Sequence, residues 1–185
     1  ATVTLVSGVT AGLPEPAAVD VVHVTTAEQM KVAVDKHAPE ADAVVMSAAV
    51  ADFRPSSVAT AKIKKGAGEP DTIGLVKNED ILAGLVRARD EGRLRPEIAI
   101  VGFAAETGDA QGDVLHHARA KLARKRCDLL VVNAVGEGRA FEVDSNDGWL
   151  LGADGSEIAM EHGSKALMAS RVLDALVAAM RRRNG

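Results

Sequence analysis

Cysteine and aromatic residues are scarce in this chain of 185 residues. Cys127 is its one cysteine, so no disulfide can form within the chain, and a reducing cytoplasm is the expected setting. With 3 phenylalanines, 1 tryptophan and no tyrosine, the chain lacks the stacking platforms of a single-strand nucleic-acid binder. Its net charge of −4 also argues against a protein that wraps nucleic acid.

Long hydrophobic runs are missing as well. No apolar stretch approaches the roughly 20 residues that span a bilayer, and no signal-peptide pattern is present. The 47% hydrophobic and 26% charged residues are ordinary for a globular protein with one sizeable core. The sequence therefore predicts one domain over residues 1–185, located in the cytoplasm.

Short apolar segments alternate with helical patterns along the chain. Strands are expected at residues 3–8, 19–24, 43–49, 72–78, 98–106 and 129–135, and helices at 25–37, 82–92, 113–126 and 164–183. Thr25, with Glu28 three residues later, is a capping-box start for the first helix. Apolar strands without alternation, such as residues 98–106, are typical of parallel strands buried on both faces. This pattern predicts a Rossmann-like, doubly wound, mostly parallel α/β sheet that binds ligands beyond the carboxyl ends of its strands.

The C-terminal third departs from that alternation. Two turn signals, Asn-Asp-Gly at residues 146–148 and Asp-Gly at residues 154–155, predict antiparallel hairpins between residues 141 and 160. Such an excursion leaves an edge strand, from which we expect a homodimer. The closing helix has apolar residues at every fourth position: Met168, Val172, Leu176 and Met180.

Asp52 is the first residue with a chemical interpretation. It follows a strand end made of small residues, where a ligand can approach the backbone and a carboxylate can contact a ribose or a metal. The alternative is a carboxylate that only caps the following loop.

Lysines form two further candidates. Lys62, Lys64 and Lys65 lie in a polar stretch at residues 54–70, read as a functional loop that folds over phosphates or, alternatively, as a solvated face. Lys121 and Lys125 share one helix face, which is either a binding surface or an exposed basic surface.

The common nucleotide and hydrolase fingerprints are absent. The chain has no GxGxxG, no GxxxxGK[ST], no HExxH and no GxSxG pattern. The residues by themselves therefore indicate an α/β domain that binds a small anionic ligand of nucleotide type.

Five motifs occur together in one order: SAAVADF, KIKK beginning ten residues after Asp52, VKNEDIL, GFAAET and VVNAV. This set resembles the phosphopantothenate–cysteine ligase family, over the chain from about residue 3 to its C-terminus. The resemblance implies activation of the 4′-phosphopantothenate carboxylate by CTP, with Mg²⁺, to an acyl-cytidylate that the amine of cysteine then attacks. It also implies frequent fusion behind a flavin-dependent decarboxylase, which would be the only part to use FMN.

The resemblance also implies which residues act. Lys62 corresponds to the lysine at the reacting phosphate, and Asp52 is the expected metal-side carboxylate. A helix N-terminus at Glu79 and Asp80 would offer backbone N–H groups to a pyrimidine edge. The implied nucleotide contacts are Met46, Ser47, Ala48, Asp52, Lys62, Glu79, Asp80, Ile81, Leu82, Phe103, Lys121 and Lys125.

One part of the family pattern has no counterpart. The family begins with a glycine-rich loop and an NxSSG-like segment, whereas this chain begins at what resembles the second strand, with Ala1 in place of an initiator methionine. We therefore expect the natural protein to continue upstream. Two other functions stay open: a CTP-binding module without turnover, and an NAD-dependent oxidoreductase.

Overall fold

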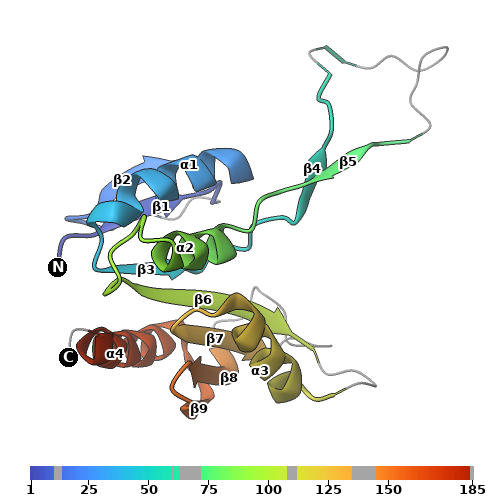
Figure 1. Cartoon of the computed structure of the whole chain (residues 1–185). Helices are drawn as coiled ribbons and strands as arrows, with labels where there is room; N and C mark the ends of the chain where they lie inside the picture. The colour runs from blue at the N-terminus through green and yellow to red at the C-terminus, as the bar shows by residue number, and fades with distance from the viewer. Residues whose placement is uncertain (11–13, 60, 63–71, 108–111, 135–144, 184–185) are drawn as a thin grey trace. The chain divides into compact units, whose positions relative to one another are not determined.

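The computed structural model describes residues 1–10, 14–59, 61–62, 72–107, 112–134 and 145–183 (Figure 1). The chain divides into two compact units, each described here by itself. The first comprises Ala1–Val34 and Ala49–Asp80, and the second Asp35–Ala48 and Ile81–Gly185. A single domain over the whole chain stays a prediction. Among the described residues, no helix is both long and apolar enough to cross a membrane.

The first unit holds two small sheets. In one, β1 (Thr4–Ser7) pairs in parallel with β2 (Asp20–His23), and α1 (Ala27–His37) follows. In the other, β4 (Phe53–Pro55) pairs antiparallel with β5 (Leu75–Lys77). The second pair changes two expectations: the stretch at 54–70 begins as a strand, and the strand predicted at 72–78 is shorter.

The start of α1 lies one residue later than predicted. The Thr26 hydroxyl accepts a hydrogen bond from the Gln29 N–H at 3.1 Å, and Gln29 Oε1 accepts one from the Thr26 N–H at 3.3 Å. This reciprocal pair is a capping box of Thr26 and Gln29, so the assignment to Thr25 and Glu28 was wrong. Thr25 instead donates its own N–H and hydroxyl to Gln29 Oε1.

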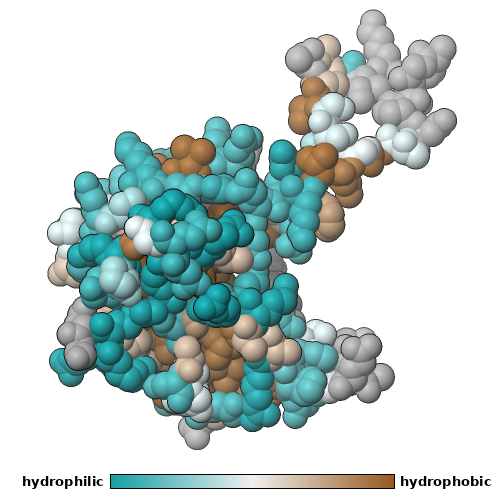
Figure 2. All heavy atoms as spheres, viewed as in Figure 1, coloured by the Kyte–Doolittle hydropathy of each residue, from teal (hydrophilic) through white to brown (hydrophobic). Residues whose placement is uncertain are grey.

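Asn78 fastens the base of the β4–β5 ribbon. Its amide nitrogen donates to the Ala51 carbonyl at 2.8 Å, its Oδ1 accepts from Arg54 at 2.9 Å, and its N–H donates to the Asp52 carbonyl at 2.8 Å. Apolar side chains along the ribbon are open to solvent, as the brown atoms on it show (Figure 2). Phe53 is 55% exposed and Leu75 is 61% exposed.

The second unit is built on a five-stranded sheet of order β3-β6-β7-β8-β9. The strands β3, β6 and β7 run parallel, and β8 and β9 are antiparallel additions. The prediction of a mostly parallel sheet with a C-terminal antiparallel excursion is thus confirmed. The elements of this unit are η1 (Ala38–Glu40), β3 (Ala43–Met46), α2 (Ile81–Asp90), β6 (Ala99–Glu106), α3 (Val114–Lys125), β7 (Leu129–Ala134), β8 (Ser145–Gly152), β9 (Glu157–Ser164) and α4 (Lys165–Arg183).

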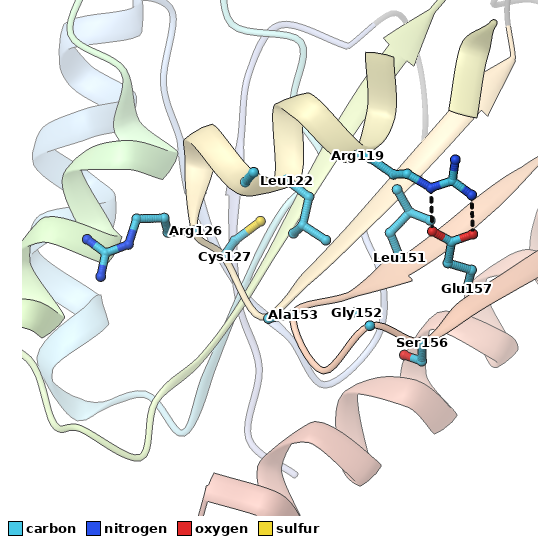
Figure 3. Close-up of a pocket in the computed structure, with 11 residues that line it drawn as sticks. Arg119, Leu122, Arg126, Cys127, Leu151, Gly152, Ala153, Ser156 and Glu157 are labelled. Atoms are coloured by element: carbon cyan, nitrogen blue, oxygen red, sulfur yellow. Dashed lines mark hydrogen bonds and ion pairs between the residues drawn. The ribbon is translucent and has the colours of Figure 1, made fainter. Parts of the chain in front are cut away.

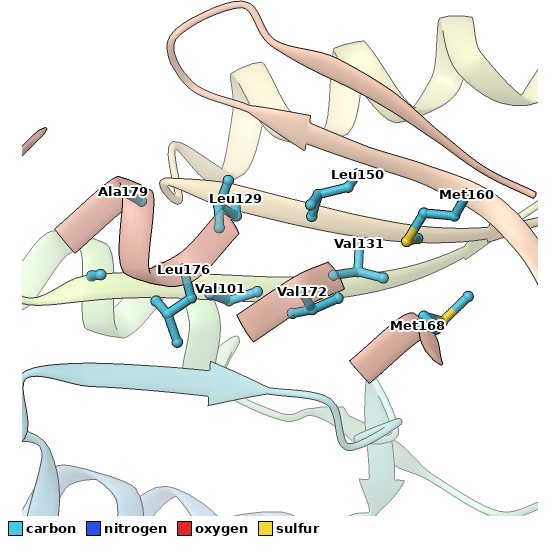
Figure 4. Packing of buried hydrophobic residues seen from close by; sticks show 10 residues of the cluster. Val101, Leu129, Val131, Leu150, Met160, Met168, Val172, Leu176 and Ala179 are labelled. Carbon is cyan, nitrogen blue, oxygen red and sulfur yellow. The ribbon is translucent and has the colours of Figure 1, made fainter. Parts of the chain in front are cut away.

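Helices cover both faces of this sheet, which explains its apolar strands. Helix α4 packs on one face and α3 on the other, with α2 against β6 (Figure 1). The apolar residues of α4 and of its sheet face form one buried cluster (Figure 4). Its members are Ala99, Val101, Leu129, Val131, Leu150, Met160, Met168, Val172, Leu176 and Ala179.

The Asn-Asp-Gly signal at residues 146–148 does not form a turn. It lies inside β8, where the pairing with β9 shifts register between Asn146 and Gly148. A methyl group on Gly148 would clash with the Val132 carbonyl oxygen, so the glycine permits close strand approach. The turn predicted at residues 154–155 is confirmed, with Gly155 at φ 84°. Residues 141–144 of the predicted excursion lie outside the described residues.

Asp128 joins three parts of the second unit at the amino ends of the parallel strands. Its Oδ2 accepts from Arg89 at 2.5 Å and from the Ile100 N–H at 2.7 Å, and its Oδ1 accepts from Arg183 at 2.8 Å. Only 14% of the Asp128 side chain and 8% of the Arg89 side chain are exposed. The end of α4 is thereby fixed to the start of β7 and to α2.

Candidate functional site

The carboxyl ends of β3 and β6 form the candidate site of the second unit. The two strands are parallel, and Met46 at the end of β3 pairs with Gly102 of β6, next to Phe103. Ser47 and Ala48 follow β3 directly and are exposed. Two segments implied by the resemblance therefore lie side by side, at the edge where sheets of this type bind ligands.

The site residues of β6 face opposite sides of the sheet. Phe103 is half-buried and packs against the cluster under α4. Glu106, an odd number of residues further on, points to the face that α3 covers. Its carboxylate forms an ion pair with the Lys121 ammonium of α3. Phe103 and Lys121, which are both expected to contact the nucleotide, thus lie on opposite faces of the sheet.

Lys121 is partly enclosed. Its side chain is 28% exposed and that of Glu106 is 18% exposed, so the pair is shielded from much of the solvent. Lys125 lies one helical turn further from the strand ends and is half-buried. The interpretation of both lysines as a freely exposed basic surface does not fit this burial.

The start of α2 offers backbone rather than side chains. Ile81 and Leu82 are 5% and 9% exposed and belong to the core of the second unit. Their side chains are therefore not available to a ligand. Their backbone N–H groups lie in the first turn of the helix, where N–H groups have no partner within the helix, and these can face a ligand. Glu79 and Asp80 precede them as the last residues of the first unit. Glu79 is exposed, with its carboxylate 3.4 Å from the Lys31 ammonium.

The other expected contacts of the first unit are open to solvent. Asp52 lies at the base of the β4–β5 ribbon, where its carbonyl accepts from the N–H of Asn78, the neighbour of Glu79. Asp52 and Lys62 both have exposed side chains. Lys64 and Lys65 lie outside the described residues.

The described residues do not supply a complete metal site by themselves. In the part of the chain that the structure describes, no three His, Cys, Asp or Glu side chains are grouped as a metal site. Mg²⁺ is commonly bound by one or two carboxylates together with substrate phosphates. The exposed carboxylate of Asp52 fits such a role, with the remaining ligands supplied by a nucleotide and water.

A cavity of about 480 Å³ lies elsewhere in the second unit, between the end of α3 and the β8–β9 turn (Figure 3). Leu122, Cys127 and Leu151 give it an apolar lining. Arg119 at its rim is bound by both oxygens of Glu157, at 2.6 and 2.7 Å. This ion pair lowers the pKa of the Glu157 carboxyl, chiefly through the hydrogen bond from Arg119.

This cavity is not suited to a nucleotide. It lies toward the amino end of β7, away from the strand ends described above. Its second arginine, Arg126, is bound by Asp90 at 2.9 Å. Burial raises the pKa of the Cys127 thiol to about 11, and the side chain is inaccessible, so Cys127 is a small core residue as expected for a lone buried cysteine.

Two residues at the carboxyl ends of the parallel strands were not identified from the sequence as parts of the site. Glu106 was inside the GFAAET motif, and its acidic type at a strand end was a usable signal. Asn133 was inside the VVNAV motif. Its amide oxygen is buried and, among the described residues, has no hydrogen-bond partner. Nothing in the sequence reveals a missing partner.

Comparison with known proteins identifies the family. Residues 1–180 match the family described as DNA/pantothenate metabolism flavoprotein C-terminal domain. The chain is 71% identical over 177 residues to the coenzyme A biosynthesis bifunctional protein CoaBC of Mycobacterium tuberculosis, covering 96% of this chain and 42% of that protein. It thus spans less than half the length of such relatives.

Solved structures agree on the fold. The C-terminal domain of a coenzyme A biosynthesis bifunctional protein CoaBC superposes with a TM-score of 0.72 at 30% identity, covering 98% of this chain and 75% of that one. A Cab2 variant in complex with phosphopantothenate-cysteine gives a TM-score of 0.65 at 18% identity, covering 90% of this chain and 54% of that one. The chain belongs to the DNA/pantothenate metabolism flavoprotein C-terminal domain family.

Proposed function

We propose that this chain is the part of a coenzyme A biosynthesis enzyme that joins 4′-phosphopantothenate to L-cysteine at the expense of CTP. The supporting observation is that Ser47 and Ala48 directly follow β3 and that Phe103–Glu106 end β6, its parallel neighbour, both inside motifs of the ligase family. Relatives named for coenzyme A biosynthesis and a fold neighbour bound to phosphopantothenate-cysteine are consistent with this chemistry.

The proposed reaction has two steps. A carboxylate oxygen of phosphopantothenate attacks the α-phosphorus of CTP, and pyrophosphate leaves. The cysteine amine then attacks the acyl carbon, CMP leaves, and the nitrogen loses a proton. Lys62 would neutralise the charge that builds on the α-phosphoryl oxygens, and Lys121 would bind a phosphate group. Mg²⁺ bound to the nucleotide, with Asp52 as a protein ligand, would neutralise further phosphate charge.

Nucleotide selectivity tests this function. A ligand bound by the folded state alone raises stability by RT ln(1 + [L]/Kd). CTP should raise the melting temperature of this chain more than equimolar ATP, GTP or NAD. Equal shifts for the three nucleoside triphosphates would refute the pyrimidine assignment, and a shift with NAD alone would favour an oxidoreductase.

Turnover is tested separately from binding. Pyrophosphate release from CTP is measured with phosphopantothenate present and cysteine absent, for this chain and for a version extended at its N-terminus to the length of its relatives. Release by the extended version alone would make the present chain a CTP-binding module. No release by either version, despite CTP binding, would refute the ligase.

Assembly is a further part of the proposal. Strand β9 ends the described sheet, and Ile158 on it is 47% exposed, which suits pairing with a second copy. We expect a homodimer by light scattering, and a monomer at high micromolar concentration would contradict it. The relatives are named bifunctional, which supports fusion to a second domain. In our proposal this is an upstream flavoprotein decarboxylase that uses FMN, and both parts are located in the cytoplasm.

A further inference from the structure

Asn133 has a buried amide oxygen that lacks a hydrogen-bond partner within the described part of the chain. Its Oδ1 is shielded from solvent, and no described residue donates a hydrogen bond to it. Buried polar atoms are almost always paired, because an unpaired acceptor has lost its hydration without compensation. Such an exception in a native fold calls for a donor from beyond the residues that the structure describes.

The position of Asn133 favours a bound substrate as that donor. It is the last residue but one of β7, at the carboxyl ends of the parallel strands. Its cross-strand neighbours are Ala105 on β6 and Gly148 on β8. Neither the methyl group of alanine nor the hydrogen atom of glycine can donate a hydrogen bond to the amide.

An aromatic ring lies on the same side of the sheet. Cross-strand partners share a face, and alternate residues of a strand do too, so Asn133, Ala105 and Phe103 face the same way. Phe103 is half-buried and Ala105 is exposed. An aromatic ring and a hydrogen-bond acceptor that both neighbour a small exposed residue suit a planar base that carries an N–H group.

We propose that Asn133 Oδ1 accepts a hydrogen bond from the exocyclic amino group of the nucleobase, so that Asn133 selects cytosine over uracil. Uracil carries a carbonyl oxygen where cytosine carries the amino group, so two acceptors would meet. Sites built around a buried hydrogen bond reject ligands that cannot complete it. This inference rests on the proposed use of CTP and names a specificity residue for it.

The test compares CTP and UTP binding by titration calorimetry, for the wild-type chain and for Asn133→Leu. Wild type should prefer CTP. The leucine variant should bind CTP at least tenfold more weakly, bind UTP with little change, and so lose most of the preference. Asn133→Asp, which keeps an acceptor at this position, should retain the preference for CTP.

Stability in the absence of nucleotide provides a second readout. Because Asn133→Leu removes an unpaired acceptor, its melting temperature should not fall. The matched control is Asn78→Leu, since the Asn78 side chain has both a donor and an acceptor partner. That variant should melt at a lower temperature than the wild-type chain. An equal fall for both variants would show that Asn133 has a structural partner and would overturn the proposal.

The remaining outcomes are distinct. If wild type prefers CTP and Asn133→Leu keeps that preference, the role of Asn133 is wrong while the proposed function stands. If Asn133→Leu weakens binding of 4′-phosphopantothenate but not of CTP, the donor is the amide of that substrate, and the assignment to the base is overturned. If wild type shows no preference for CTP, the proposed function fails, and this inference fails with it.

Discussion

Lys121 of α3 and Glu106 at the end of β6 form an ion pair that is largely shielded from solvent. The pair fixes the lysine ammonium at the carboxyl end of a central strand. Because the lysine stem must be held against the helix for this contact, little side-chain freedom remains to be lost when a phosphate binds.

Lys121→Met tests whether this ammonium contacts a phosphate. The variant should weaken CTP binding by about tenfold or more, equivalent to the loss of one charge-assisted hydrogen bond. CMP binding should weaken less if the contact is to the outer phosphates. Titration calorimetry with both nucleotides measures the difference. Lys36→Met, at an exposed lysine of α1, is the control and should change neither affinity.

Lys62→Ala tests the catalytic assignment. If the Lys62 ammonium stabilises charge as the mixed anhydride forms, pyrophosphate release should fall on the order of 10²–10³-fold, which is more than the loss of CTP affinity. Lys62→Arg should not restore it fully, because a planar guanidinium cannot replace a compact ammonium at one oxygen. Lys65→Ala should cost much less. Wild-type release by folded Lys62→Ala would make Lys62 surface charge.

Asp128→Ala should be strongly destabilising. It would leave the guanidinium of Arg89, which is 8% exposed, without its carboxylate. Removing one partner of a buried ion pair typically costs about 3–5 kcal/mol of unfolding free energy. Asp42→Ala is the control, since Asp42 pairs with Arg95 at the surface, where both side chains are well exposed. Urea denaturation should show a loss of about 1 kcal/mol or less for the control.

Two glycines of the second unit should respond in opposite ways to alanine. Gly148→Ala places a methyl group against the Val132 carbonyl, so we expect a loss of about 1–3 kcal/mol. Gly84 lies inside α2 with open space around the added carbon, and Gly84→Ala should stabilise by about 0.4–1 kcal/mol. Equal effects on the denaturation midpoint would mean that β8 does not approach β7 as closely as described.

Asp154 should contribute to stability in a pH-dependent way. Hydrogen bonds from the Ser156 hydroxyl and N–H, and then the charge of Arg182, lower the pKa of the Asp154 carboxyl. As the pH falls below the ordinary carboxyl pKa of about 3.9, the unfolded chain binds this proton while the folded chain does not. The stability of the fold therefore decreases until the folded carboxyl also titrates at its lower pKa. Asp154→Asn should reduce the loss of stability as the pH falls below about 4. Parallel acid curves for both proteins would contradict the assignment.

Several elements could be predicted because local pattern and tertiary environment agree. The apolar runs of β6 and β7 lack alternation, and helices do cover both faces of these strands. The spacing of Met168, Val172 and Leu176 correctly identified the buried side of α4. Residues 146–148 have the sequence of a turn but form part of β8, because β8 pairs with β7 on one side and with β9 on the other. Pairing with distant strands is not encoded in the local sequence.

Contacts between distant positions explain most of what the sequence did not reveal. Asp128 contacts Arg89 and Arg183, which are 39 and 55 residues away, and no motif links them. The residues of the candidate site were proposed from motifs. Their burial was not, because whether Ile81 offers its side chain or only its backbone depends on the packing of α2.

The place of α4 in the chain has a consequence for biosynthesis. All five strands of the second unit leave the ribosome before this helix does. Until α4 is made, one side of the nascent sheet presents Val101, Leu129, Val131 and Leu150 to solvent. Exposed apolar sheet surfaces of this kind favour aggregation and chaperone binding during synthesis. Folding of this unit should therefore be completed late, when Arg183 emerges and reaches Asp128.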